Sequence, residues 1–208
     1  IERNITVIRG DSATGKTTFV EMIQSFEQYG RSSGVTVQCR RPCRVLNSVD
    51  WEYRLGGIEN SIVFLDEGNE FVKSETFARA VRGSTNYFVI ITRENLYQLP
   101  YSVNSILKLK TTNRRAKTYV RSYPLYDHLA DPMDRISHVE RIITEDSNSG
   151  HEMFEHIARN GGVICESALG KSNIFGKLLE WSSERVLVIA DGAAFGAELE
   201  KIHRLLEQ

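Results

Sequence analysis

The stretch 9–18 carries residue types suited to binding phosphate. It fits the pattern Gly, four residues, Gly-Lys-Thr, with Gly10, Gly15 and Lys16 at fixed positions. In such a loop backbone N–H groups wrap an anion, the lysine reaches the β- and γ-phosphates, and the hydroxyl of Thr17 ligates Mg²⁺. A glycine-rich turn that holds a lysine by chance is the alternative. The predicted nucleotide site comprises Gly10, Asp11, Ser12, Ala13, Thr14, Gly15, Lys16, Thr17 and Thr18.

Two adjacent acids, Asp66 and Glu67, follow the apolar run 62–65. Downstream of a phosphate-binding loop, the first acid would hold Mg²⁺ and the second would polarise an attacking water. Two solvated acids at the end of a core strand are the alternative. The upstream loop favours the functional interpretation, so we expect Lys16 and Glu67 to be catalytic and Asp66 to join Thr17 as a metal ligand.

These residues require particular elements around them. Apolar residues 5–8 predict a strand before the loop, and apolar positions from Phe19 to Phe26 recur with the period of a helix. The run 62–65 has no polar alternation, which suits a central strand of a parallel sheet. The sequence therefore predicts an α/β fold.

Further elements are expected between and after these motifs. Alternation over 34–40 predicts a second strand, and 47–55 predicts a short helix capped by Asn47 or Ser48. A helix over 74–81 and a buried strand over 87–93 complete this part.

The adjacent acids and the strand that ends near Thr92 resemble the additional-strand, catalytic-glutamate division of P-loop NTPases, which includes the AAA and RecA-like ATPases. The resemblance implies that the strand ending at Thr92 lies between the other two, and that Thr92, beside Arg93, senses the γ-phosphate. Capping of the strand end is the other role open to Thr92. The chain has no Leu-Ser-Gly-Gly-Gln stretch and no Asn-Lys-x-Asp guanine reader, so adenine is expected by elimination.

Segments 105–110 and 117–123 alternate on either side of a short turn and predict an antiparallel hairpin at a sheet edge. Its tip is basic, which could bind a nucleic-acid backbone or a partner's acidic face. Edge strands also carry cations simply to prevent aggregation. The candidate contacts to nucleic acid are Lys110, Arg114, Arg115 and Lys117.

Charge and turn residues divide the chain into a phosphate-binding domain over 1–128, a linker over 129–138 and a smaller domain over 139–208. The first 128 residues carry a net charge of +5 and the remainder −6, within a total of −1.

No apolar run is long enough to span a membrane and no secretory signal is present, so we expect a cytoplasmic protein. The three cysteines lack a zinc-site spacing and are expected to be reduced.

The last 70 residues alternate strand and helix three times, which predicts a small parallel α/β domain. Glu145, Asp146 and Asp191 fall at strand ends. Glu145 and the run 191–196 resemble a Toprim domain, in which acids of the first and third strands converge on Mg²⁺. Ala193 replaces the second acid of the Asp-x-Asp motif, so we expect Glu145 and Asp191 to lie close together but cleavage of DNA or RNA to be weak or absent. An unrelated doubly wound domain with solvated acids is the alternative.

The function that these motifs favour is an Mg²⁺-dependent ATPase with ATP as its nucleotide, associated with nucleic-acid processing. A nucleotide-gated binding module with little turnover competes with it, since no arginine finger can be assigned among Arg79, Arg82, Arg93 and Arg121. A small-molecule kinase would need a substrate lid that the sequence does not reveal. Oligomerisation is compatible with each function.

Overall fold

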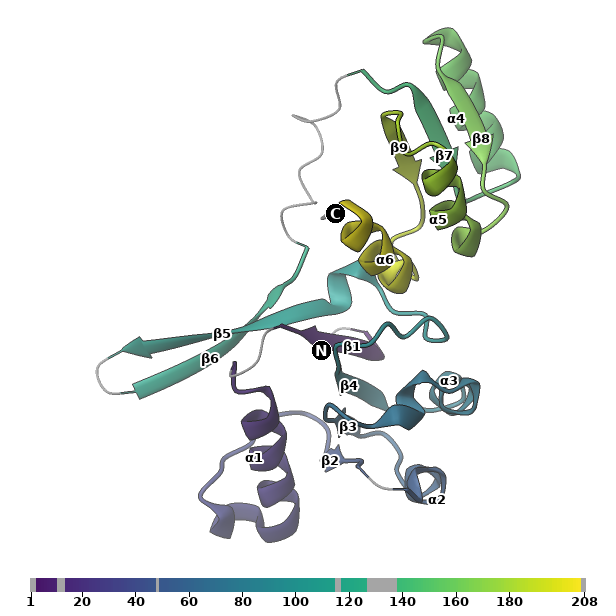
Figure 1. Ribbon diagram of the computed structural model, residues 1–208. Coiled ribbons are helices and arrows are strands. Elements are labelled where there is room, and N and C mark those ends of the chain that lie inside the picture. The colour runs from purple at the N-terminus through teal and green to yellow at the C-terminus, as the bar shows by residue number, and fades with distance from the viewer. Residues whose placement is uncertain (1–2, 11–13, 48, 115–116, 127–137, 207–208) are drawn as a thin grey trace. The chain divides into compact units, whose positions relative to one another are not determined.

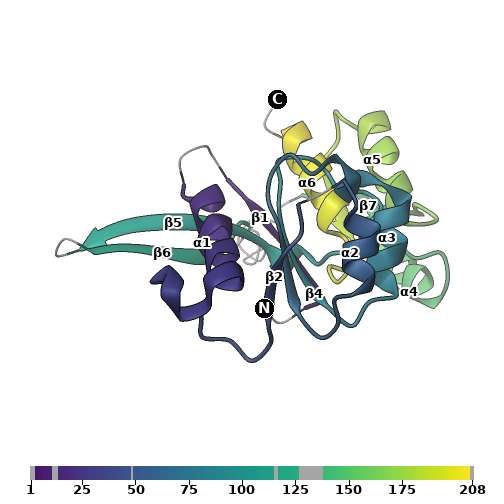
Figure 2. The same ribbon diagram turned by 90° about the horizontal axis from the view of Figure 1, so that it is seen from below.

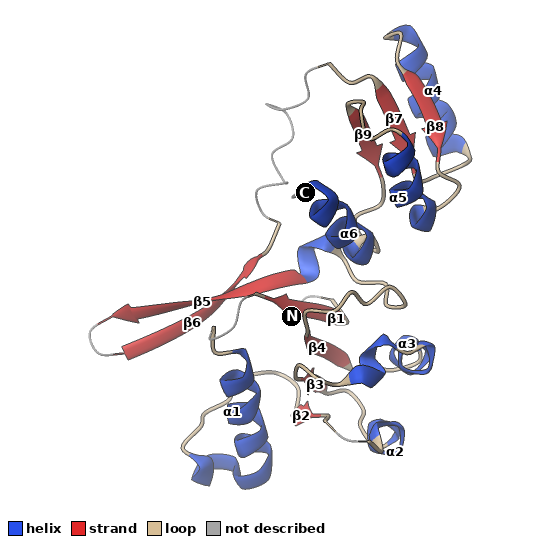
Figure 3. Cartoon of the chain, in the orientation of Figure 1, coloured by secondary structure: helices blue, strands red, loops and turns tan. Residues whose placement is uncertain are grey.

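The chain folds into two compact units, Ile1–Leu125 and Tyr126–Gln208, each with its own sheet (Figures 1 and 3). The computed structural model describes residues 3–10, 14–47, 49–114, 117–126 and 138–206, with side chains omitted for 113, 114, 117–119, 205 and 206. The expected linker over 129–138 lies, except for His138, outside these residues. Within the part described, no helix is both long and apolar enough to cross a membrane.

The first unit holds a six-stranded sheet in the order β2-β3-β4-β1-β5-β6. Neighbouring strands run parallel from β2 to β5, and β6 pairs antiparallel with β5 as the predicted hairpin. Strand β4 therefore lies between β1 and β3. The bounds are β1 Ile5–Arg9, β2 Cys43–Val45, β3 Ile62–Leu65, β4 Tyr87–Ile91, β5 Ile106–Arg114 and β6 Lys117–Pro124.

Helices cover both faces of this sheet, with α1 on one face and α2 and α3 on the other (Figure 2). Val20 and Ile23 of α1 pack on a buried cluster that includes Ile8 and Ile91. On the opposite face the rings of Trp51, Phe71, Phe77 and Phe88 form a chain of stacked and edge-on contacts. The helices are α1 Lys16–Tyr29, η1 Gly30–Ser33, α2 Trp51–Gly56, η2 Glu70–Lys73, α3 Glu75–Arg82 and η3 Val103–Ser105.

Two predicted elements of this unit are wrong or shifted. Residues 34–40 form no strand, because the edge position beside β3 is taken by Cys43–Val45. Val37 still packs against the core, which explains the alternating pattern of residues 34–40.

The helix expected over 47–55 begins only at Trp51, and the side chain of its N-cap residue Asp50 makes no capping hydrogen bond. The predicted helix 74–81 is confirmed as α3, capped by the Ser74 hydroxyl, which accepts from the Phe77 N–H at 3.1 Å.

The second unit is the predicted small parallel α/β unit. Its sheet has the order β8-β7-β9, so the first strand is central. Ile143 of β7 and Ile174 of α5 are fully buried. The elements are β7 Arg141–Thr144, α4 Ser149–Asn160, β8 Ile164–Ser167, α5 Lys171–Glu180, β9 Val186–Ile189 and α6 Gly196–Leu206.

Candidate nucleotide site

Strand register brings the predicted site residues of the first unit to one edge of the sheet. Leu65, Ile90 and Val7 lie in one row across β3, β4 and β1. The residues that follow each strand therefore meet at the carboxyl ends of the three strands, where open α/β sheets bind ligands. These followers are the loop from Gly10, Thr92, and the acids Asp66 and Glu67.

The loop after β1 turns through two glycines. Gly10 has φ 129° and Gly15 has φ 85°, conformations that side chains with a Cβ rarely adopt. Lys16 begins α1 and is 6% exposed. Its ammonium donates to the Gly10 carbonyl at 2.8 Å and to the Thr14 hydroxyl at 3.2 Å. The predicted contacts Asp11, Ser12 and Ala13 lie outside the described residues.

Thr92 is buried at the end of β4 and is tied to the strand beside it. Its carbonyl accepts from Arg9 Nη1 at 2.7 Å, and its hydroxyl oxygen accepts from the Glu94 N–H at 2.9 Å. The second contact is the strand-end cap that was the alternative to a sensor role. The hydroxyl proton remains able to donate, so capping and phosphate sensing are chemically compatible.

Arg9 is a further residue of this site, not predicted from the sequence. It is the last residue of β1 and only 6% exposed, and it ties β1 to the end of β4 through Thr92. A cation that ends an apolar strand immediately before the glycine loop is the signal that could have identified it.

The two acids after β3 line a cavity of about 200 Å³ together with Thr92 and Arg93. Arg93 Nε lies 2.8 Å from Glu67 Oε1 in an ion pair. Asp66 Oδ1 accepts from the Glu67 N–H at 2.8 Å. The structure thus brings Asp66, Glu67 and Thr92 together. It also pairs Glu67, the candidate base, with Arg93, a contact that the sequence did not predict.

The oxygen donors at this edge suit Mg²⁺. Thr17 is exposed in the first turn of α1, and Asp66 has one carboxylate oxygen engaged with the backbone. Magnesium is commonly held by one or two protein oxygens, with waters and substrate phosphates completing the octahedron. Thr17 and Asp66 would therefore be its protein ligands, with the metal neutralising phosphate charge.

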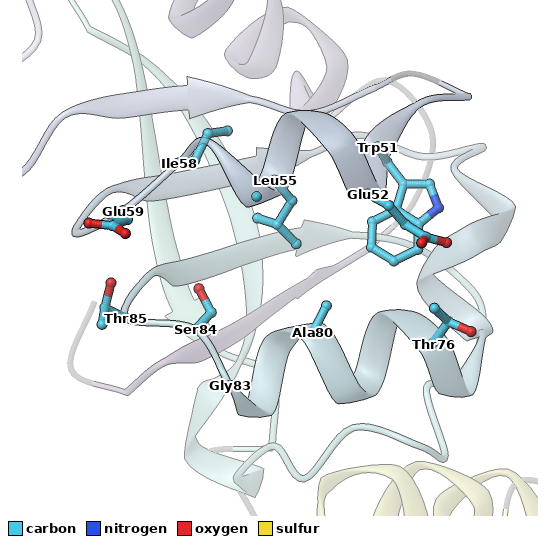
Figure 4. Close-up of a pocket in the computed structure, with 11 residues that line it drawn as sticks. Trp51, Glu52, Leu55, Ile58, Glu59, Thr76, Ala80, Gly83, Ser84 and Thr85 are labelled. Carbon is cyan, nitrogen blue, oxygen red and sulfur yellow. The ribbon is translucent and has the colours of Figure 1, made fainter.

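A larger cavity of about 410 Å³ lies between α2 and α3 (Figure 4). Its lining includes Trp51, Leu55 and two glutamates, Glu52 and Glu59, but no lysine or arginine. It contains none of the predicted site residues. Because it offers no cation to a phosphate, we do not assign the nucleotide to it.

In the second unit, the predicted proximity of Glu145 and Asp191 is confirmed. Glu145 Oε2 accepts from the Asp191 N–H at 3.0 Å, and Asp191 Oδ1 accepts from the Ala193 N–H at 2.8 Å. Asp146, the other acid that follows β7, has its carboxylate against Gly150 in the first turn of α4: a Cβ built there would lie 2.6 Å from Asp146 Oδ2. A negative charge is favourable at that helix end.

Glu145 and Asp191 each have one carboxylate oxygen engaged with a backbone N–H, as Asp66 does, but Ala193 stands where the resemblance expects a further acid, so this site supplies fewer ligands than expected. Across the described ranges, no three His, Cys, Asp or Glu side chains are grouped to hold a metal ion. The His151 ring nitrogen Nδ1 lies 2.9 Å from the Thr144 hydroxyl, within hydrogen-bond distance.

Comparison with known proteins adds no relative to this picture. No protein-family model matches the chain, and no curated protein does so. The geometry of the site is therefore the basis for assigning a function.

Proposed function

We propose that the first unit binds ATP with Mg²⁺ and hydrolyses it. One observation carries this proposal. The Lys16 loop, Thr92 and the two acids follow the carboxyl ends of three adjacent parallel strands, β1, β4 and β3. The position of β4 between the other two strands supports the resemblance to the catalytic-glutamate ATPases. ATP rather than GTP follows from the absence of a guanine-reading motif in the sequence.

Each residue would have a separate task in this reaction. Lys16 and the loop amides would hold the phosphates, and electrostatic stabilisation of that kind is a major source of catalysis. Glu67 would accept a proton from the attacking water. Thr92 would donate its hydroxyl proton toward the γ-phosphate, while Arg9 holds the backbone of Thr92 in place.

One observation favours a nucleotide-gated switch as the second candidate. Glu67 is paired with Arg93 at 2.8 Å, and a carboxylate held by a guanidinium is less available to a water. In the switch, nucleotide would bind at the same loop without useful turnover. The two candidates share the binding step and differ only in hydrolysis.

The basic hairpin supports a coupling of this nucleotide cycle to nucleic acid. Among its proposed contacts, Lys110 is exposed on β5, while Arg114 and Lys117 close the hairpin in register with each other. Arg115 lies outside the described residues. For the second unit we propose no cleavage activity, because Ala193 replaces one of the expected acids and the described residues hold no group of three metal-ligating side chains.

Nucleotide binding is tested with a fluorescent ATP analogue and the Lys16→Ala variant. Arg31→Ala is the matched control, since it removes one exposed cation from η1 without touching the site. We expect Lys16→Ala to lose most of its affinity and Arg31→Ala to bind like the parent. Unchanged binding by Lys16→Ala would refute both candidates.

Hydrolysis is tested by phosphate release from the parent and Glu67→Gln. Turnover by the parent that is lost in Glu67→Gln, with ATP still bound, supports the ATPase. Binding without turnover in either protein supports the switch.

A further inference from the structure

The two faces of the hairpin β5–β6 differ in charge. Residues directly opposite in an antiparallel pair share a face, and successive residues alternate between faces. Lys108 pairs with Tyr123 and Lys110 pairs with Arg121, so these four residues share one face. The same face continues toward the turn with two further pairs, Thr112 with Tyr119 and Arg114 with Lys117.

The opposite face is uncharged, and its β5 residues contact the core and the loop that carries Thr14. Leu109 packs against the core cluster beneath α1, and the Thr111 hydroxyl lies 3.5 Å from the Thr14 carbonyl. Their partners in β6 are Ser122 and Val120. Since neither strand contains an acidic residue, every charge of the hairpin strands is positive, and the charged side chains that the structure describes, Lys108, Lys110 and Arg121, lie on the first face. We call that face, with Lys108, Lys110, Arg121 and Tyr123 as its described side chains, the cationic face.

The cationic face combines accessible cations with an aromatic ring. Lys110 and Arg121 are exposed, and Tyr123 is 40% exposed. The Lys110 ammonium lies 5.3 Å from the centre of the Tyr123 ring. Lys108 and Lys110 are two residues apart on β5, which in a strand is a spacing of about 6.8 Å, and Arg121 lies directly across from Lys110.

We propose that the cationic face binds single-stranded nucleic acid, with phosphates along Lys110 and Arg121 and a base stacked on Tyr123. Single strands are bound without sequence preference by positive surfaces that carry aromatic platforms. Duplex bases already stack on each other, so an exposed tyrosine would add little to duplex binding. The spacing of Lys108 and Lys110 is also about twice the 3.4 Å rise per strand of a duplex, which suits an extended strand. This binding rests on the proposed coupling to nucleic acid and does not require hydrolysis.

The test measures anisotropy of a labelled oligodeoxythymidine with the full chain over a range of salt concentrations, without nucleotide. Replacing both Lys110 and Arg121 by Ala should weaken binding at least tenfold and reduce the salt slope by about 1.4, since each phosphate contact contributes about 0.7 for single strands. Tyr123→Ala should weaken binding about fivefold or more, and Tyr123→Phe should retain it. Ser122→Asp is the matched control, because it adds one negative charge on the opposite face, and it should bind nearly like the parent.

Four results would overturn the assignment: no binding at low salt, unchanged affinity in the double variant that keeps its circular dichroism, tighter binding to duplex than to single strand, or equal competition by poly-glutamate. The last would identify a surface for acidic polypeptides instead. Lys16→Ala should bind the oligonucleotide like the parent. A protein that binds ATP but no oligonucleotide, or oligonucleotide but no ATP, would therefore show which proposal fails.

Discussion

Glu67 and Arg93, which follow the neighbouring strands β3 and β4, form an ion pair in which Arg93 Nε lies 2.8 Å from Glu67 Oε1. Both side chains are partly exposed, so the pair contributes no more than about 1 kcal/mol. Under the proposed function, this pair would act on hydrolysis rather than on stability, because it holds the carboxylate of the candidate base.

Removing the base should separate binding from chemistry. Glu67→Gln keeps the shape of the side chain but cannot accept a proton, so phosphate release should fall about 100-fold or more while ATP affinity is retained. Release at the parental rate would show that Glu67 is not the base. Glu59→Gln, on a glutamate near the amino end of β3 and therefore away from the carboxyl ends that carry the site, should leave release unchanged.

Arg93→Ala should raise phosphate release about two- to fivefold. The substitution releases the Glu67 carboxylate from its ion pair. A partly exposed ion pair is worth at most about 1 kcal/mol, so the rate should change by no more than a few-fold. Arg82→Ala is the matched control, because Arg82 pairs with Glu75 on α3 at 2.6 Å and should leave release unchanged. A loss of turnover in Arg93→Ala would instead mean that Arg93 positions the carboxylate.

Arg9→Met should destabilise the first unit by about 1.5–3 kcal/mol, the range for a hydrogen bond to a charged group. The substitution leaves the Thr92 carbonyl without the donor that Arg9 Nη1 supplies at 2.7 Å. Urea unfolding measures the change, with Arg54→Met on the exposed side of α2 as the control. Equal stability of the two variants would contradict a positioning role for Arg9.

Glu145→Ala should lower stability by about 1 kcal/mol, because it removes the acceptor of the Asp191 N–H. The parent should not nick supercoiled DNA in Mn²⁺ above the level of this variant. Manganese-dependent nicking by the parent that disappears in Asp191→Ala would show that the acids of the second unit are catalytic.

Cys43 should resist alkylation. Burial, together with the hydrogen bond and charge of Cys39, raises the pKa of its thiol to about 12. The reactive thiolate is therefore scarce at pH 8 and increases only as pH rises toward 12. Mass spectrometry after iodoacetamide treatment should find exposed Cys39 modified first, and rapid labelling of Cys43 at pH 8 would contradict the prediction.

The sequence alone determined the local elements that bear the chemistry. The glycines and Lys16 predicted the turn into α1, and the unbroken apolar run 62–65 predicted a buried strand, since these patterns reflect backbone freedom and burial within a few residues of chain. It also placed acids at strand ends in the second unit. The error at 34–40 arose because alternation reports burial of Val37 but not whether a strand has a partner.

Only the tertiary structure decided which of these residues meet. Strand order places Thr92 between the loop and the acids, and register separates the hairpin cations from Leu109 and Thr111. The pairing of Glu67 with Arg93 and the burial of Arg9 against Thr92 join residues 26 and 83 positions apart. Such contacts depend on how strands assemble across the sheet, and no local pattern of residue types encodes that order.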